Sequence, residues 1–212
     1  TILIPIYNDR ESLKKLIENI NQELNGVNAE VSILVINDAS SQQIIDTYPN
    51  LGNIHSFEII NMKQNRGHAR CIASGLKYIY EKKEFDYVIP MDGDGEDRPQ
   101  ELKNFIQLSE HAGDQSIVGE RVKRSEGLFF QTCYIFHKFL TLVFTGQTIK
   151  FGNYSCLSKV TIEKMLKEKA TWSSFSGSLR KVEKDLVSTP SIRGARYFGP
   201  SQMSFFNLLK HS

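Results

Sequence analysis

Short apolar runs alternate with stretches of helical periodicity through the first two-thirds of the chain. The apolar runs that predict strands are residues 1–6, 31–37, 57–62, 86–91 and 115–119. The stretches that predict helices are residues 13–24, about 66–82 and 101–111. This alternation predicts an α/β fold with a mostly parallel central sheet covered by helices on both faces. Residues 170–200, rich in Ser, Gly and Arg, are expected to form an irregular loop.

The composition is that of an ordinary globular domain. Of 212 residues, 40% are hydrophobic and 24% are charged, and 26 basic against 24 acidic residues leave a net charge of +2. The absence of a basic arm or an acidic tail in the sequence argues against a nucleic-acid partner. Three widely spaced cysteines, Cys71, Cys133 and Cys156, predict a reducing compartment and buried thiols instead of disulfides or a zinc site.

The two ends of the chain suggest a trimmed protein. Thr1 already lies inside an apolar run, with no initiator Met and no signal peptide before it. Residues 203–212 begin an amphipathic pattern, so we expect the chain to stop before a membrane-associated C-terminal region. The sequence contains no charge-free apolar run of about 18 residues, the length that predicts a membrane span.

Polar residues cluster directly after each of the first four predicted strands. The clusters are residues 5–9, 37–40, 61–70 and 91–97. Ligands of open α/β sheets bind outside the carboxyl ends of the strands, where such loops converge. We therefore expect the four clusters to line one binding crevice.

The cluster at 91–97 holds four carboxylates that repel one another and so call for a cation or a strongly cationic ligand, unless the cluster is a solvated acidic turn. Asp92 and Asp94 both reach one ion if Gly93 lets the backbone turn tightly, and Glu96 is a third candidate ligand. Oxygen ligands next to a diphosphate suit Mg²⁺ or Mn²⁺. For Asp97 we prefer the role of capping the helix that begins near residues 98–99.

Other polar residues of the crevice have both binding and structural interpretations. Gly67 opens a helix, where free backbone amides and Arg66 or Arg70 would meet a phosphate, although an ordinary helix-start glycine explains it equally. Tyr7 is suited to stack on a base, and Asp9 and Asp38 are suited to accept hydrogen bonds from a nucleoside. His68 is expected to be a surface or hydrogen-bonded residue. Asn8 and Glu11 have the spacing of a helix capping box.

Taken together, these segments resemble glycosyltransferase family 2, the inverting sugar-nucleotide enzymes with a GT-A fold. The matching stretches are ILIPIYND, VINDAS, NRGHARCIASG and MDGDGEDRPQEL, which cover about residues 1–125. Two later stretches, FGNYSCLSKVTIEKML and RYFGPSQMSFFNLL, look like the polyprenyl-phosphate branch, similar to dolichyl-phosphate mannose synthase. The resemblance implies a single GT-A catalytic domain over 1–212, with a nucleotide-sugar part at 1–125 and an acceptor part at 126–212.

The resemblance also implies roles for individual residues. It places Pro5, Tyr7, Asp9 and Asp38 at the nucleoside, and Asp92 with Asp94 at the donor diphosphate through Mg²⁺ or Mn²⁺. With the patterns above, the expected nucleotide-binding residues are Pro5, Tyr7, Asp9, Asp38, Arg66, Gly67, Asp92 and Gly93. The expected metal ligands are Asp92, Asp94 and Glu96, and the expected catalytic residues are Asp94 and Arg121.

Several positions depart from the family pattern. Asp9 replaces the commoner Glu, Glu96 stands where the branch has Gln, and Gln202 stands where Lys is frequent. Asn37 and Ala39 replace the first Asp and the Gly of the usual Asp-Asp-Gly.

The acceptor decides whether the reaction needs a base. A sugar hydroxyl must lose a proton, whereas a lipid phosphate is already an anionic nucleophile at neutral pH. Residues 148–159 contain no Asp or Glu, which favours a polyprenyl phosphate, although Asp94, Glu183 or Asp185 remains available as a base. The aromatic-rich residues 127–146 fit an interfacial helix at the cytoplasmic membrane face, and a buried core helix equally well.

Three other functions compete with this interpretation. A sugar-phosphate nucleotidyltransferase is disfavoured because no glycine-rich loop follows the first strand. A glycosyltransferase that extends a glycan at a hydroxyl, and an inactive nucleotide-binding module, both stay open.

Overall fold

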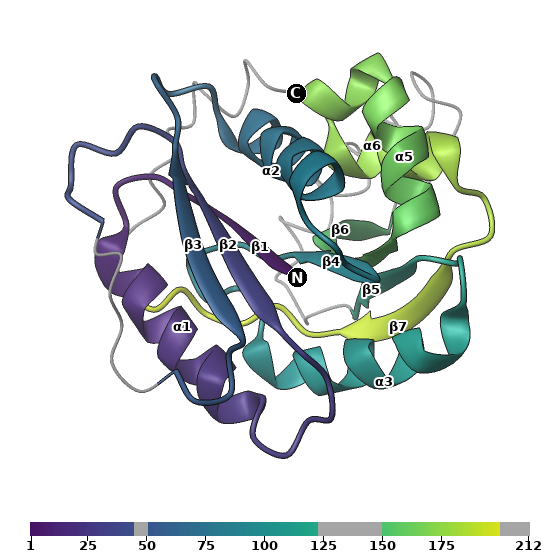
Figure 1. Ribbon diagram of the computed structural model, residues 1–212, viewed down its shortest axis with the longest axis horizontal. Helices are drawn as coiled ribbons and strands as arrows, with labels where there is room; N and C mark the ends of the chain where they lie inside the picture. The colour runs from purple at the N-terminus through teal and green to yellow at the C-terminus, as the bar shows by residue number, and fades with distance from the viewer. Residues whose placement is uncertain (45–50, 123–149, 200–212) are drawn as a thin grey trace, which may run out of the picture.

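A mixed sheet runs through the middle of the molecule (Figure 1). The computed structural model describes residues 1–44, 51–122 and 150–199. Within these residues the sheet has seven strands in the order β3-β2-β1-β4-β6-β5-β7. The strands are β1 (Ile2–Ile6), β2 (Ser32–Asn37), β3 (Ser56–Asn61), β4 (Tyr87–Pro90), β5 (Ile117–Arg121), β6 (Phe151–Ser158) and β7 (Val187–Ser191).

Strands β1 to β4 are parallel, so their carboxyl ends meet at one edge of the sheet. Strand β6 inserts between β4 and β5 and is antiparallel to both, whereas β5 and β7 are parallel to each other. The expected mostly parallel sheet is confirmed, with β6 as its antiparallel member.

Helices cover both faces of the sheet, as the sequence predicts (Figure 1). Helices α1 (Arg10–Glu23) and α3 (Leu102–Ala112) lie against one face. Helices α2 (His68–Lys82), α5 (Lys159–Lys167) and α6 (Phe175–Val182) lie against the other. Two 3₁₀ turns, η1 (Pro99–Glu101) and η2 (Lys169–Trp172), precede α3 and α6.

The apolar strands appear in the sequence as continuous runs because each one contributes side chains to the two cores on opposite faces of the sheet. In β1, Ile2, Ile4 and Ile6 pack into the core beneath α1, whereas Leu3 packs into the core beneath α2. Successive strand side chains point to opposite faces, so a strand buried on both sides has no polar alternation. Gly75 lets α2 approach β1 closely, because a Cβ at this position would lie 2.3 Å from Leu3 Cδ1.

Some local expectations from the sequence are wrong. Residues 170–200 are more regular than expected, since they contain most of η2, all of α6 and all of β7. The capping box does not form: α1 begins at Arg10, and Asn8 instead accepts hydrogen bonds from Ser41, outside the helix. Residues 127–146, residues 203–212 and Gln202 lie outside the described part of the chain.

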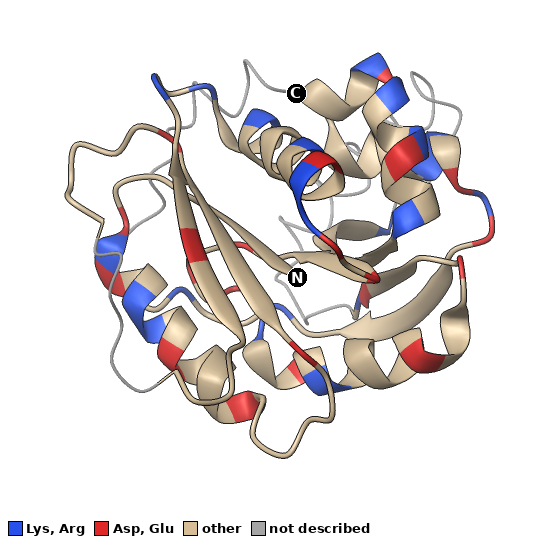
Figure 2. Ribbon diagram, viewed as in Figure 1, with Lys and Arg blue, Asp and Glu red and all other residues tan. Residues whose placement is uncertain are grey.

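The surface and the thiols agree with the composition. Figure 2 shows basic and acidic residues interspersed over the outer helices. Cys71 and Cys156 are free and buried, as expected, and Cys133 lies outside the described residues. None of the described helices combines the length and the apolar character that crossing a membrane requires.

Candidate active site

A hollow of about 360 Å³ opens at the carboxyl edge of β1 and β4. It is where the sequence places the binding crevice. Seven of the expected site residues line it: Pro5, Tyr7, Asp9, Asp92, Gly93, Asp94 and Glu96. Ile6 also lines it, together with four polar residues that the sequence analysis did not assign to the site: His68, Asn153, Arg193 and Arg196.

The loop after β1 is tied to the loop after β2. Asn8 takes a left-handed backbone conformation with φ of 49°, and its Oδ1 accepts hydrogen bonds from Ser41 N at 2.8 Å and Ser41 Oγ at 3.1 Å. In return, Asn8 N donates to Ser40 Oγ at 2.8 Å. This exchange holds the two loops together and leaves Tyr7 40% exposed at the rim of the hollow.

Asp38 is engaged with the loop between β3 and α2. Its Oδ1 accepts a hydrogen bond from Arg66 N at 2.7 Å, and its Oδ2 accepts one from Gly67 N at 2.8 Å. The backbone amides of Arg66 and Gly67 are therefore occupied by Asp38. A phosphate contact through the side chain of Arg66 or Arg70, or through the first amides of α2, stays a prediction. Asp38, Arg66 and Gly67 lie together at the carboxyl edge but do not line the hollow.

Asp92 lies close to a histidine and an asparagine that come from different elements. His68 Nε2, at the start of α2, is 3.2 Å from Asp92 Oδ1, and Asn153 Nδ2, on β6, is 2.8 Å from the same histidine nitrogen. Burial is the strongest single influence on the pKa of Asp92 and acts to raise it. The charges of His68 and Arg193 and the polar contacts of His68 and Asn153 together outweigh burial and lower the pKa to about 2. Burial likewise acts to lower the pKa of His68, and the charges of Asp92, Asp97 and Asp94 outweigh it, so this pKa is raised.

Asp97 does not cap a helix, contrary to the expectation from the sequence. The residue at the N-cap of η1 is Arg98, and Asp97 Oδ2 accepts a hydrogen bond from Asp92 N at 2.9 Å. Burial and the charge of Asp92 raise the pKa of Asp97 well above its ordinary value. Asp97 thus braces the carboxylate loop through the backbone of Asp92.

Two arginines from the segment after β7 neutralise the carboxylates. Arg196 donates from Nη1 to Asp94 Oδ2 and from Nη2 to Asp9 Oδ2, each at 2.6 Å. Arg193 forms an ion pair with Glu96. Burial, together with the charges of Asp92 and Glu96, still raises the pKa of Asp94. The carboxylates of this cluster, whose like charges repel, are therefore paired with two arginines of the same chain.

Arg121 lies beside the hollow at the end of β5. Its guanidinium packs against Gly152 of β6, where a Cβ would lie 2.6 Å from Arg121 Nη2. Gly152 immediately precedes Asn153, which lines the hollow. A side chain at position 152 would therefore displace the guanidinium, and glycine there makes room for it.

The residues of the hollow fit a hard divalent cation. Asp92 Oδ1 is buried, and although His68 lies close, no group in the described part of the chain donates a well-aligned hydrogen bond to this oxygen. A buried carboxylate oxygen without a donor is suited to an ion. Among the described residues, no three His, Cys, Asp or Glu side chains converge on one ion position. Asp92 and Asp94 would accordingly share the ion with oxygens of a bound diphosphate, the arrangement that Mg²⁺ favours.

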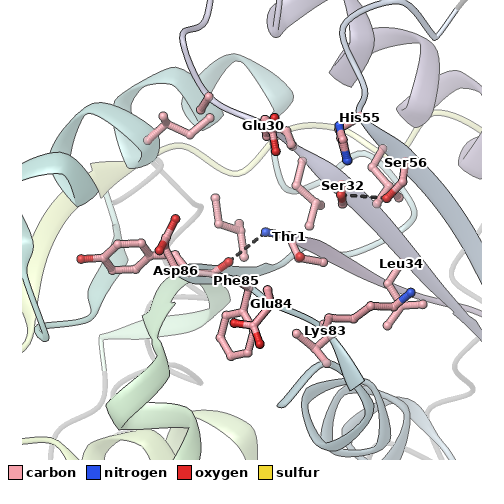
Figure 3. A pocket seen from close by; sticks show the side chains of 18 of the residues that line it. Thr1, Glu30, Ser32, Leu34, His55, Ser56, Lys83, Glu84, Phe85 and Asp86 are labelled. Atoms are coloured by element: carbon pink, nitrogen blue, oxygen red, sulfur yellow. Dashed lines mark hydrogen bonds between the residues drawn. The ribbon is translucent and has the colours of Figure 1, made fainter. Parts of the chain in front are cut away.

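A larger hollow, of about 620 Å³, lies at the opposite edge of the sheet (Figure 3). Thr1, Ser32 and Ser56, at the amino ends of β1, β2 and β3, line it, and Ser56 Oγ donates to Ser32 Oγ at 2.8 Å. Glu30 and Lys83 lie on opposite sides of this hollow, and Asp86 lies closer to Thr1 (Figure 3). Ligands of parallel sheets bind at the carboxyl ends of the strands, so the smaller hollow is the candidate site.

Sequence comparison finds one family over most of the chain. The family model described as Glycosyl transferase family 2 matches residues 1–175. A curated relative, the undecaprenyl-phosphate 4-deoxy-4-formamido-L-arabinose transferase of Proteus mirabilis (strain HI4320), is 24% identical over 219 residues. The match covers 99% of this chain and 64% of that protein, so the chain spans less than two-thirds of the relative's length.

Solved structures share the fold. Glucosyl-3-phosphoglycerate synthase from Mycobacterium tuberculosis, in complex with Mn²⁺, UDP-glucose and phosphoglyceric acid, superimposes with a TM-score of 0.67 at 13% identity, covering 99% of this chain and 74% of that one. A mannosyltransferase from Pyrobaculum calidifontis, in complex with GDP-Man and Mn²⁺, superimposes with a TM-score of 0.59 at 15% identity, covering 93% and 57%. These likenesses confirm the expected GT-A fold. Because the family model covers far more than half of the sequence, the chain belongs to glycosyl transferase family 2.

Proposed function

We propose that this protein is a metal-dependent inverting glycosyltransferase that moves a sugar from a nucleotide diphosphate sugar to a polyprenyl phosphate. The observation that carries the proposal is the meeting of Asp9, Asp92 and Asp94 in one hollow at the carboxyl edge of the sheet. The buried oxygen of Asp92 that accepts no hydrogen bond from the described residues supports a cation there. Family membership supports the reaction class.

Asp92 and Asp94 are the residues that would hold Mg²⁺ or Mn²⁺, with Glu96 beside them. When bound, the cation supplies Lewis-acid stabilisation of the leaving diphosphate. Asp92 suits this role because its pKa of about 2 keeps it ionised at neutral pH, ready to hold a cation. The two solved structures named above are each complexes with Mn²⁺ and a nucleotide sugar.

The nucleoside would lie over the loops after β1 and β2. Tyr7 is exposed at the rim, where a base can stack on its ring, and Pro5 and Asp9 line the hollow beside it. Asp38 supports this part of the site indirectly, because it holds the backbone of Arg66 and Gly67 in place. A Cβ at position 93 would lie 2.8 Å from Ile6 Cδ1, so glycine at this position makes room for the Ile6 side chain.

The acceptor is inferred from the side of the hollow that faces β6. Gly152 and Asn153 stand there with Arg121 packed against Gly152, and none of the three is an acid. A phosphate acceptor needs a cation to orient it and no base to deprotonate it, and Arg121 supplies the cation. The name of the Proteus mirabilis relative includes undecaprenyl phosphate, which supports a lipid phosphate here. On this proposal 1–125 binds the donor and 126–212 the acceptor, at the cytoplasmic face of a membrane.

One observation favours the alternative, transfer to a sugar hydroxyl. The pKa of Asp94 is raised, chiefly by burial, and a carboxylate with a raised pKa is a better general base. A hydroxyl acceptor would make use of such a base, whereas a phosphate would not.

Calorimetric titration with UDP, GDP, CDP and dTDP, each with and without Mn²⁺, tests the donor site. We expect one nucleotide to bind only with Mn²⁺, and Asp94→Asn to weaken that binding by at least about tenfold. Asp86→Asn is the matched control, because it makes the same chemical change at the opposite edge of the sheet. Transfer assays with a short polyprenyl phosphate and with a free glycan then separate the two acceptors.

Either half of the proposal can fail separately. Unchanged Mn²⁺-dependent binding in Asp94→Asn would remove that residue from the metal site. Absence of nucleotide binding to the folded wild-type protein would overturn the proposed donor site altogether.

A further inference from the structure

The end of β7 and the segment that follows it lie along the carboxylate loop as a strap, which we define as residues 191–199. Glu101 anchors its beginning, because Ser191 Oγ donates to Glu101 Oε2 at 2.7 Å and Ile192 N donates to Oε1 at 2.8 Å. Further along, Gly194 N donates to Glu96 O at 2.7 Å and Tyr197 N donates to Asp94 O at 3.0 Å. The strap and the loop are thus joined by backbone hydrogen bonds.

The fit between the two backbones is close enough to require glycine on both sides. A Cβ at Gly194 would lie 2.8 Å from Gly95 O and 3.3 Å from Glu96 O, which are backbone atoms that cannot move aside cheaply. A Cβ at Gly95 would lie 2.5 Å from the ring of Tyr197. Tyr197 is held in turn by Asn19, whose Nδ2 donates to its hydroxyl at 2.8 Å. The strap is therefore seated on the loop by shape as well as by charge.

Arg196 is the charged centre of this contact. It bridges Asp9 and Asp94, and the side chains of Arg196, Asp9 and Asp94 are only 20%, 12% and 18% exposed. Both oxygens of Asp94 are engaged, because Oδ1 accepts from Glu96 N at 2.9 Å and Oδ2 accepts from Arg196. Each oxygen keeps a second lone pair for an ion. A divalent ion bound to Asp94, however, would repel the guanidinium that lies 2.6 Å from Oδ2. The backbone amide is part of the loop, so Arg196 is the donor that can leave.

We propose that the strap is a built-in latch: Arg196 occupies the cation position when no metal is bound, and binding of the divalent ion with the nucleotide displaces it and releases the strap. This inference rests on the proposed function, because it assigns the same carboxylates to the metal. Its consequence is that the strap is open whenever the metal and the nucleotide occupy the donor site. The exposed side chains of Ile192 and Phe198 on the strap would move with it.

Titration of the protein with Mn²⁺ alone, followed by calorimetry, tests the exchange without using catalysis. Arg196→Gln removes the competing cation, and we expect it to bind Mn²⁺ about tenfold more tightly than the wild type, the scale of one charge-assisted hydrogen bond. Gly194→Ala lifts the strap without changing any charge and is expected to tighten Mn²⁺ binding in the same direction. Arg180→Gln is the matched control, because it removes the same charge from a residue of α6 that donates to Lys184 O and does not line the hollow.

Hydrogen exchange measured by mass spectrometry reports on the strap itself. In wild-type protein, we expect the amides of residues 192–197 to exchange faster after addition of Mn²⁺ and the nucleotide that binds. Circular dichroism confirms that each variant is folded. The latch is overturned if Arg196→Gln gains no more affinity than Arg180→Gln, or if the strap stays protected while metal and nucleotide are bound. If no nucleotide binds, the proposed function and this inference both fail. If a nucleotide binds with Mn²⁺ but the latch outcomes are not seen, only this inference fails.

Discussion

Replacing Asp38 by asparagine tests whether this residue organises the site instead of only contacting a ligand. Its side chain is buried, with 4% of the residue exposed, and it accepts hydrogen bonds from two successive backbone amides, those of Arg66 and Gly67. Gly67 has a φ of 87° and precedes α2, so these bonds determine where the helix begins. Asparagine keeps the shape of the side chain but has only one acceptor oxygen.

The expected cost follows from those two bonds. Each hydrogen bond to a buried charged group contributes about 1.5–3 kcal/mol, and an unsatisfied buried donor costs a similar amount. The asparagine side chain would keep one bond, made weaker by the loss of charge, and would turn its amide group toward the other backbone N–H. We therefore expect Asp38→Asn to lower the free energy of unfolding by about 3 kcal/mol. For a chain of this size, that corresponds to a fall in Tm of about 6–12 °C.

Thermal unfolding in the absence of any ligand is the assay, because it separates a structural role from a binding role. Asp86→Asn is the control, since an exposed acid at the opposite edge should change stability by no more than about 0.5 kcal/mol. A Tm for Asp38→Asn within about 2 °C of the wild type would show that the carboxylate does not hold the loop, and our reasoning on this residue would be wrong.

Three further predictions concern single residues. Ala39 has a φ of 56°, so Ala39→Gly should relieve left-handed strain and raise stability by about 1 kcal/mol, measured by denaturant unfolding. Gly152→Ala should leave Tm nearly unchanged, because the flexible end of Arg121 gives way, yet lower sugar transfer; full activity would exclude a role for the present position of Arg121. Asp97 has a raised pKa in the folded protein, so the folded state binds this proton more tightly than the unfolded state. The protonated carboxyl of Asp97 therefore contributes fully to folding stability below about pH 4, the pKa of an unfolded Asp. This contribution is lost as the pH rises through the folded-state pKa. Asp97→Asn should therefore flatten the loss of stability above about pH 4 in thermal melts with a chelator, and an unchanged slope would contradict the raised pKa.

The residues that could be found from the sequence are those that follow buried strands. The runs that became β1 to β4 are largely apolar because both of their faces are covered, and their carboxyl ends carry the polar clusters. Asp9, Asp92 and Asp94 could thus be placed at one edge from the sequence. The pairing of β6 between β4 and β5 could not, because an antiparallel insertion depends on partners far along the chain that a local pattern does not identify.

Residues 170–200 show where composition is a poor guide to structure. Ser, Gly and Arg are frequent in loops, yet Ser178 of α6 and Ser191 of β7 are buried and hydrogen-bonded. Hydroxyl partners in the tertiary structure satisfy these polar groups, and such partners are not visible in a local window. His68 and Asn153 were likewise not predicted as site residues. A lone histidine is ambiguous in sequence. Residues 148–159 gave a signal through their lack of acids and through a family resemblance that did not single out Asn153.

The sequence by itself determined that a group of carboxylates at the edge of a buried strand must meet positive charge, because like charges at close range repel. Only the tertiary structure decided which of the described residues supplies this positive charge. Arg196 lies 187 residues from Asp9 and 102 from Asp94, and it reaches both because β7 ends beside the loop that follows β4. Local patterns are governed by backbone geometry within a few residues, whereas an ion pair at this separation depends on how the whole sheet is ordered. Because of that ordering, the carboxylates that the sequence assigns to a metal are paired with Arg196 in the structure.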